Sequence, residues 1–135
     1  MSYAHRLNVY QPQALAVLRI VTAYMFIWHG TTKLFHIPDI EMFANVPLAS
    51  MEGLAAIMEV VGAILLLLGL FTRPTAFVLS GLMAVAYFIG HAIPNGNVLL
   101  PILNHGELAV VWTFVFLYLS VAGGGAWALD NFRKR

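Results

Sequence analysis

Four apolar segments, separated by polar stretches rich in proline or glycine, dominate the pattern of the chain. They cover residues 15–35, 51–70, 75–91 and 106–122. A membrane-spanning helix needs about 20 mainly apolar residues, so the first two segments have the full length and the last two are short. Pro38 and Pro47 lie in the first gap, and Pro94 and Pro101 lie in the third. The pattern predicts an all-α integral membrane protein, a four-helix bundle formed by a single domain over residues 1–135.

Composition supports a membrane protein. The chain has 135 residues, of which 61% are hydrophobic and 10% are charged, whereas soluble domains have about 25% charged residues. The net charge of +1 gives no indication of nucleic-acid binding. The absence of cysteine excludes disulfides, thiol exchange and cysteine-ligated zinc or iron–sulfur clusters. A redox role would therefore need a cofactor, a quinone or a partner subunit.

Basic residues predict the orientation. Arg6 precedes the first segment, Arg73 lies between the second and third, and residues 133–135 are all basic. The gaps 36–50 and 92–104 contain no lysine or arginine. Because basic residues favour the cytoplasmic side, we expect both termini and the Arg73 turn in the cytoplasm.

In this orientation each helix contributes an ionisable residue to its outer half. His29 and Lys33 lie in the outer half of the first helix, His91 ends the third, and His105 and Glu107 begin the fourth. The sequence therefore predicts one outer-facing layer of ionisable side chains. Each of these residues could also have a purely structural role. Histidines are common at the membrane interface, lysine side chains often extend to the membrane surface, and carboxylates are common in the first turn of a helix.

Glu59 is the exception, because it lies about seven residues inside the second helix. An unpaired carboxylate at that depth costs on the order of 2.5–3.5 kcal/mol. We expect Glu59 either to be protonated or to pair with a cation on the first helix. His29 and Lys33 are the favoured partners, and Arg19 is the third candidate.

Helical spacing also predicts which faces point inward. Small and polar residues share one stripe on each helix, as is common at membrane helix contacts. On the fourth helix the predicted inward stripe consists of Glu107, Val111, Phe114 and Tyr118.

The sequence resembles the DoxX family of small four-helix bacterial membrane proteins from Leu18 to Asp130. The resemblance rests on "LRIVTAYMFIWHGTTKLF", "MEVVGAILLLLGLFTRPTA", "NHGELAVVW" and "GGGAWALD". It implies a multi-pass protein of the bacterial inner membrane. The positions it points to are Arg19, His29, Lys33, Glu59, Arg73, Asn104, Glu107 and Asp130. The chain departs from the family at Gly124 and Ala126, where proline and arginine are commoner, and this leaves Asp130 without an obvious local partner.

The resemblance implies function only loosely, because some relatives are linked to thiosulfate–quinone oxidoreductases or redox-stress complexes. The first hypothesis is a membrane subunit of a redox system that contacts a quinone and other subunits. His29 with Lys33, and Glu59 with Glu107, would supply the hydrogen-bond donors and the proton route that a quinone needs.

Three alternatives remain open at this stage. A non-catalytic scaffold or partner-docking subunit would use the charges only to fix helix register. A small transporter is less favoured, since four helices form a thin wall unless the chain forms a homo-oligomer. Haem or metal ligation by His29, His91 and His105 is the least favoured alternative, because no close ligand pair occurs in the sequence.

Overall fold

The computed structural model describes residues 3–133, and within this range every regular element is helical. The principal helices are α2 (Gln11–Phe35), α3 (Met51–Leu68), α4 (Thr72–Ala86) and α7 (Glu107–Ala122). The short elements are α1 (Tyr3–Asn8), η1 (Glu41–Phe43), η2 (Tyr87–Ala92), α5 (Ile93–Asn95), α6 (Pro101–Asn104) and α8 (Asp130–Arg133). The predicted all-helical class is confirmed for the described residues.

The helix ends follow local chemistry. Ser50 caps α3, because its side chain accepts a hydrogen bond from the Gly53 N–H at 3.0 Å. Gly69 ends α3 two residues earlier than predicted. It adopts a left-handed φ of 66°, and the Leu70 N–H then donates to the Leu65 carbonyl. The last long helix stops at Gly123, as the glycine run predicted.

The third apolar segment is longer than predicted. Helical structure runs from Thr72 to Asn95, through α4, η2 and α5, and includes Pro94. Proline has no N–H and collides with the preceding turn of an α-helix. Here the turns before Pro94 are widened into a π-helix over Tyr87–Ala92, which changes the hydrogen-bond spacing and allows the chain to continue. The expectation that Pro94 lies in the third loop is therefore wrong.

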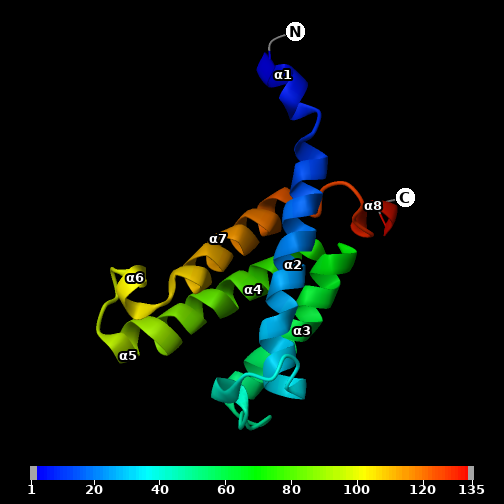
Figure 1. Cartoon of the computed structure of the whole chain (residues 1–135). Coiled ribbons are helices and arrows are strands. Elements are labelled where there is room, and N and C mark those ends of the chain that lie inside the picture. The colour runs from blue at the N-terminus through cyan, green and yellow to red at the C-terminus, as the bar shows by residue number, and fades with distance from the viewer. Residues whose placement is uncertain (1–2, 134–135) are drawn as a thin grey trace.

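The long helices form two antiparallel hairpins. Helix α2 packs along α3, helix α4 packs along α7, and α3 meets α4 through the turn that joins them. Figure 1 shows the hairpins together near the N- and C-terminal segments, which we call the terminal end, and diverging toward the opposite loop end. Gly30 allows the close contact of α2 with α3, since a Cβ there would lie 2.7 Å from the Ala56 carbonyl oxygen.

The two hairpins are joined by an apolar core between them. Phe26 of α2 packs edge-on against Trp112 and Phe116 of α7, with ring centroids 4.9 Å apart in each case. Leu66 of α3, Leu79 of α4 and Leu119 of α7 complete this contact. Toward the loop ends the two hairpins diverge (Figure 1).

The prediction of which face of the last long helix points inward is wrong. Val111, Phe114 and Tyr118 are more than half exposed on the isolated chain, and Glu107 is also exposed. The buried face of α7 instead consists of Ala109, Trp112, Phe116 and Leu119. Helix α7 is apolar on all sides, so the spacing of its hydrophobic residues does not determine which face packs.

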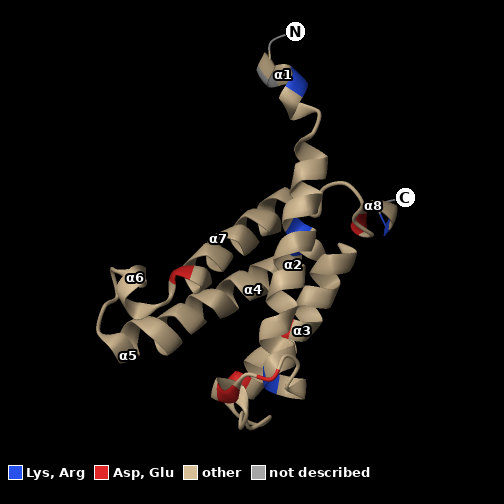
Figure 2. Cartoon of the chain, in the orientation of Figure 1, with Lys and Arg blue, Asp and Glu red and all other residues tan. Residues whose placement is uncertain are grey.

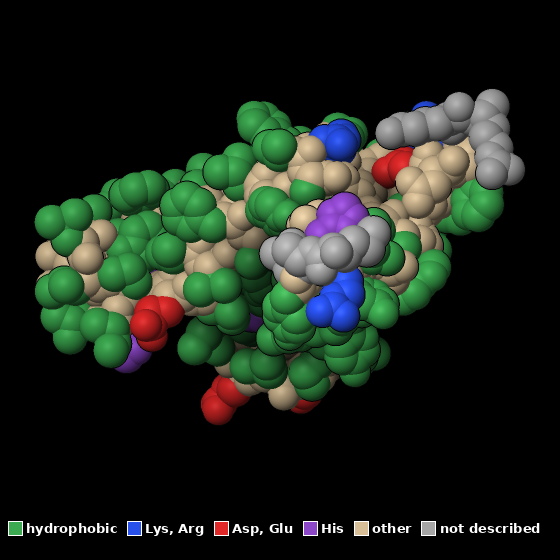
Figure 3. All heavy atoms as spheres, turned by 90° about the horizontal axis from the view of Figure 1, so that it is seen from above, with side chains coloured by type: hydrophobic (Ala, Val, Ile, Leu, Met, Phe, Trp, Pro, Cys, Tyr) green, Lys and Arg blue, Asp and Glu red, His purple; other side chains and the backbone are tan. Residues whose placement is uncertain are grey.

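The exterior fits a lipid environment. Within residues 3–133, Gln11–Phe35, Met51–Leu68 and Thr72–Asn95 are long and apolar enough to cross a membrane. Helix α7 is also apolar but has 16 residues, about 24 Å of helix. Charged residues are sparse within the helices and gather near their ends (Figure 2), while hydrophobic side chains cover the flanks (Figure 3).

Candidate functional site

A buried ion pair joins α2 to α3 near the loop end. The Lys33 Nζ donates to both carboxylate oxygens of Glu59, at 2.9 and 3.0 Å. The side chains are 13% and 5% exposed. Lys33 also lies 5.5 Å from the centre of the Phe43 ring, which covers the pair from η1. Of the two partners favoured for Glu59 by the sequence, the structure selects Lys33.

His29 lies one helical turn before Lys33, at the point where the two hairpins meet. Its ring packs edge-on against Trp112 of α7, with centroids 4.7 Å apart. The side chain is only partly exposed. Among residues 3–133, no group forms a hydrogen bond with either nitrogen of the His29 ring. The site thus combines a histidine that has no hydrogen bond among residues 3–133 with an ion pair one turn away.

Arg19 lies at the opposite end of α2 and does not pair with Glu59. It is fully buried, and its Nη1 donates to the carbonyls of Leu66 and Leu67, the latter at 2.9 Å. Its Nε donates to the Gly124 carbonyl at 2.9 Å, while Nη2 has no partner in the described structure. Arg19 therefore caps the C-terminus of α3 and ties it to the segment after α7. Its candidacy as the partner of Glu59 is excluded.

His91 and Asn104 belong to a second, separate cluster at the loop end of the α4/α7 hairpin. Asn104 is fully buried, and its amide donates to the Tyr87 hydroxyl at 3.0 Å and to the Asn97 carbonyl at 2.6 Å. Its Oδ1 accepts from the Gly106 N–H, and its carbonyl accepts from His91 Nδ1 at 3.2 Å. These bonds organise the loop between α5 and α7.

The single outer layer of ionisable residues expected from the sequence is not formed. The loop ends of the two hairpins diverge (Figure 1), so the Asn104 cluster and the Lys33–Glu59 pair occupy different arms. Glu107 is exposed on α7 and does not join Glu59, and His105 is an exposed residue with a left-handed φ of 59°. Across residues 3–133, no three His, Asp or Glu side chains gather in a way that would hold a metal ion. The triad of His29, His91 and His105 is therefore not a ligand set.

Sequence reasoning missed the partners of Asp130. Its carboxylate accepts hydrogen bonds from the N–H groups of Phe71 and Thr72, each at 2.8 Å, and so caps the N-terminus of α4. Arg133 lies 3.7 Å from the same carboxylate. No local partner of Asp130 was obvious from the sequence, and its hydrogen-bond partners indeed come from a turn 58 and 59 residues away, whereas Arg133 of the next helical turn is a local partner that was overlooked. The Leu-Asp of the closing motif was the only sequence signal for this cap.

Three relatives are similar to the chain over most of its length. An "Uncharacterized protein" of Haemophilus influenzae is 49% identical over 94% of this chain and 96% of its own length. The Escherichia coli "Inner membrane protein YphA" is 32% identical over 90% of this chain and 91% of its own. The Bacillus subtilis "Putative oxidoreductase CatD" is 28% identical over 86% of this chain and 84% of its own. No solved structure matches the chain significantly.

The DoxX family model matches residues 14–92, which contain most of α2, all of α3 and α4, and the Lys33–Glu59 pair. The chain belongs to the DoxX family. Together with its apolar helices, this makes it a membrane protein with transmembrane helices. The matched residues include Arg19, His29, Lys33 and Glu59, whereas Trp112, which contacts His29, lies outside the matched range.

The Asp130 cap of this DoxX protein predicts a loss of stability in acid. Partial burial raises the pKa of Asp130, but hydrogen bonds from Thr72 and Phe71 and the Arg133 charge outweigh it, so the pKa lies below its ordinary value of 3.8. A carboxylate with a lowered folded-state pKa stabilises the fold above the unfolded-state pKa, and this contribution is lost as the pH falls through the folded-state pKa.

Asp130→Ala should therefore lower the free energy of unfolding by about 1 kcal/mol at neutral pH, as expected for a lost cap. In detergent melts at pH values from neutral to below 3.8, the difference in stability between the wild type and Asp130→Ala should shrink as the pH falls. A constant difference between the two proteins across this range would contradict the role of the charge.

Proposed function

We propose that this DoxX protein is a membrane subunit of a redox system and binds a quinone head group at His29. The observation that carries the proposal is the His29 ring, which has no hydrogen-bond partner among residues 3–133 although it lies in a membrane-spanning helix. Polar groups in such surroundings are costly unless they are hydrogen-bonded. A quinone carbonyl would accept the hydrogen bond that His29 has available.

The neighbouring groups suit the same ligand. The ammonium of Lys33 has three N–H donors, and two of them bind Glu59, so one remains for a second acceptor. Trp112 offers an aromatic surface beside His29. Reduction of a quinone takes up protons with the electrons, and the Lys33–Glu59 pair is a titratable unit one turn from the proposed site.

The electrons would come from another subunit. The chain has no cysteine, so it carries no thiol couple of its own. The name of the Bacillus subtilis relative, "Putative oxidoreductase CatD", supports a redox context for the family. We therefore propose association with other subunits of a redox complex.

We further propose that the protein lies in the inner membrane of a bacterium with both termini in the cytoplasm. The name of the Escherichia coli relative, "Inner membrane protein YphA", supports the location. The distribution of basic residues supports the orientation, because Arg6, Arg73 and Arg133 lie at the terminal end.

Titration with a short-chain ubiquinone tests the proposal. Quinones quench tryptophan fluorescence, so binding at His29 should quench the emission of Trp112. Replacing His29 with leucine should weaken binding about three- to tenfold, the effect of one neutral hydrogen bond. His105→Ala is the matched control, since it removes an exposed histidine on the other hairpin, and it should bind as the wild type does. Quenching that survives in both His29→Leu and Trp112→Phe would place the quinone elsewhere.

A non-catalytic scaffold is the second candidate. Arg19 and the Lys33–Glu59 pair each join two segments of the fold through hydrogen bonds within the chain, as structural charges do. This function predicts that a Lys33→Leu/Glu59→Leu double variant, if folded, still captures the native partner subunits. The redox proposal predicts that the same variant keeps its partners but loses quinone-dependent electron transfer.

A further inference from the structure

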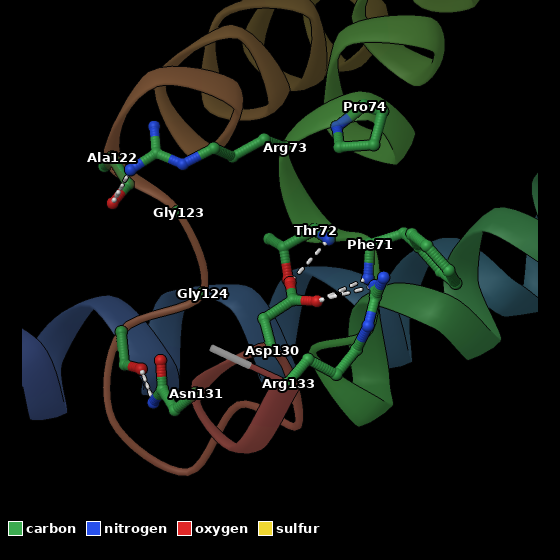
Figure 4. Close-up of a pocket in the computed structure, with 11 residues that line it drawn as sticks. Phe71, Thr72, Arg73, Pro74, Ala122, Gly123, Gly124, Asp130, Asn131 and Arg133 are labelled. Carbon is green, nitrogen blue, oxygen red and sulfur yellow. Dashed lines mark hydrogen bonds and ion pairs between the residues drawn. The ribbon is translucent and has the colours of Figure 1, made fainter. Parts of the chain in front are cut away.

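A cavity of about 480 Å³ opens at the terminal end of the molecule, away from the His29 site. The first turn of α4 forms one wall, the glycine run after α7 forms another, and α8 closes the base (Figure 4). Arg73, Asp130 and Arg133 are the charged residues of its lining. In the predicted orientation this end lies at the cytoplasmic surface, at the level of lipid head groups.

The cavity has a positive balance of charge, with two arginines against one aspartate. The Asp130 carboxylate is directed at the N–H groups of Phe71 and Thr72. The Arg73 guanidinium crosses to α7, where it donates to the carbonyls of Ser120, Val121 and Ala122. Figure 4 draws the bond to Ala122. The Nε–H of Arg73 has no partner within residues 3–133. Arg133 stacks 4.0 Å from the Phe71 ring and touches Asp130 only through Nη1. Both arginines therefore keep N–H donors for an anion.

An apolar groove continues from the same place along the membrane-facing side of α3 and α4. It has a volume of about 390 Å³, and its lining includes Ile57, Val61, Leu65 and Val78. Pro74 belongs to the lining of both the cavity and the groove. Along α3 the groove extends from Leu65 near the terminal end to Ile57, about 12 Å of helix. A basic cavity at the membrane surface thus adjoins an apolar groove that runs toward the membrane centre.

We propose that the cavity and the groove together form a binding site for an anionic phospholipid. The phosphate group lies between Arg73 and Arg133, and one acyl chain lies in the groove between α3 and α4. Charge complementarity selects the occupant, because basic pockets between transmembrane helices bind anionic head groups. A free phosphate ion would leave the apolar groove empty, and a neutral quinone would leave the excess positive charge without a counter-charge.

Native mass spectrometry of the full-length protein tests the site. The protein is delipidated in detergent and titrated with dioleoyl phosphatidylglycerol or dioleoyl phosphatidylcholine. The wild type should prefer the anionic lipid, and Arg133→Gln should weaken its binding about fivefold, the effect of one basic residue near an anionic lipid. Val78→Trp, which fills the groove without changing charge, should weaken binding of both lipids.

Arg6→Gln is the matched control, because it removes the same charge from exposed α1, and it should leave lipid preference unchanged. Equal binding of the two lipids by the wild type would overturn the proposal, as would equal losses in Arg6→Gln and Arg133→Gln. Displacement of the lipid by inorganic phosphate at equal concentration would indicate a free-anion site and also overturn it. Binding that survives Val78→Trp unchanged would exclude the groove and with it the two-part site.

Discussion

Glu59→Gln will destabilise the protein by about 3 kcal/mol, because it leaves the Lys33 ammonium buried without its counter-charge. Removing one member of a buried ion pair typically costs 3–5 kcal/mol, and the 13% exposure of Lys33 places the effect at the lower end. Lys33→Met should cost a similar amount, since it leaves the Glu59 carboxylate unpaired.

The double variant Glu59→Gln/Lys33→Met should cost clearly less than the sum of its singles, because neither charge is then left alone. Melts in detergent measure all three variants. Glu59→Gln with His29→Ala provides an internal comparison, and here we expect a much smaller coupling, since His29 forms no hydrogen bond to Glu59. Glu52→Gln removes an exposed carboxylate from the same helix and should be neutral. Additive losses for Lys33 and Glu59 would contradict the pair.

Arg19→Met will be at least as damaging, with an expected loss of about 3–5 kcal/mol. The substitution removes three charge-assisted hydrogen bonds and leaves carbonyls of Leu66, Leu67 and Gly124 without this donor. The loss is smaller than the sum of the three bonds, because the substitution also removes the cost of burying a cation. The loss is larger than at the ion pair because Arg19 holds α3 and the Gly124 segment at once.

Arg19→Lys should restore only part of this stability, because an ammonium is a point charge and does not reproduce the fork of a guanidinium. Hydrogen exchange adds a local measurement. Amides of the Gly69–Leu70 turn and of the segment after Gly123 should exchange faster in Arg19→Met, while those of α6 should be unchanged. A variant as stable as the wild type, with unchanged exchange, would show that Arg19 does not hold these segments.

The sequence was sufficient to predict what depends on local chemistry and on the cost of burying charge. Glycine and proline marked most helix ends, since left-handed caps and proline restrictions are local properties. The pairing of Glu59 with the first helix followed from the energy of a buried carboxylate. The choice among His29, Lys33 and Arg19 did not, because it depends on how the side chains pack.

The sequence was not sufficient where the outcome depends on how helices pack. The face of α7 was mispredicted because both Val111 and Trp112 are hydrophobic, and only packing, such as the contact of Trp112 with Phe26, distinguishes them. The divergence of the two hairpins, which separates Glu107 from Glu59, depends on crossing angles that hydrophobic spacing does not encode. The Asp130 cap depends on a contact between distant segments. The π-helix before Pro94 accommodates the missing N–H of the proline, and no residue type in the sequence indicates where such a π-helix forms.

Native quinone content is the most direct test of the central claim, that His29 and its surroundings bind a quinone. Wild-type protein, His29→Leu and His105→Ala are purified from bacterial membranes in the same detergent with no added quinone, and the extracted lipids are analysed. We predict that the wild type and His105→Ala retain a similar amount of quinone per chain, and that His29→Leu retains about three- to tenfold less. Quinone at the level of an unrelated membrane protein in the wild type, or equal retention by His29→Leu, would contradict the claim.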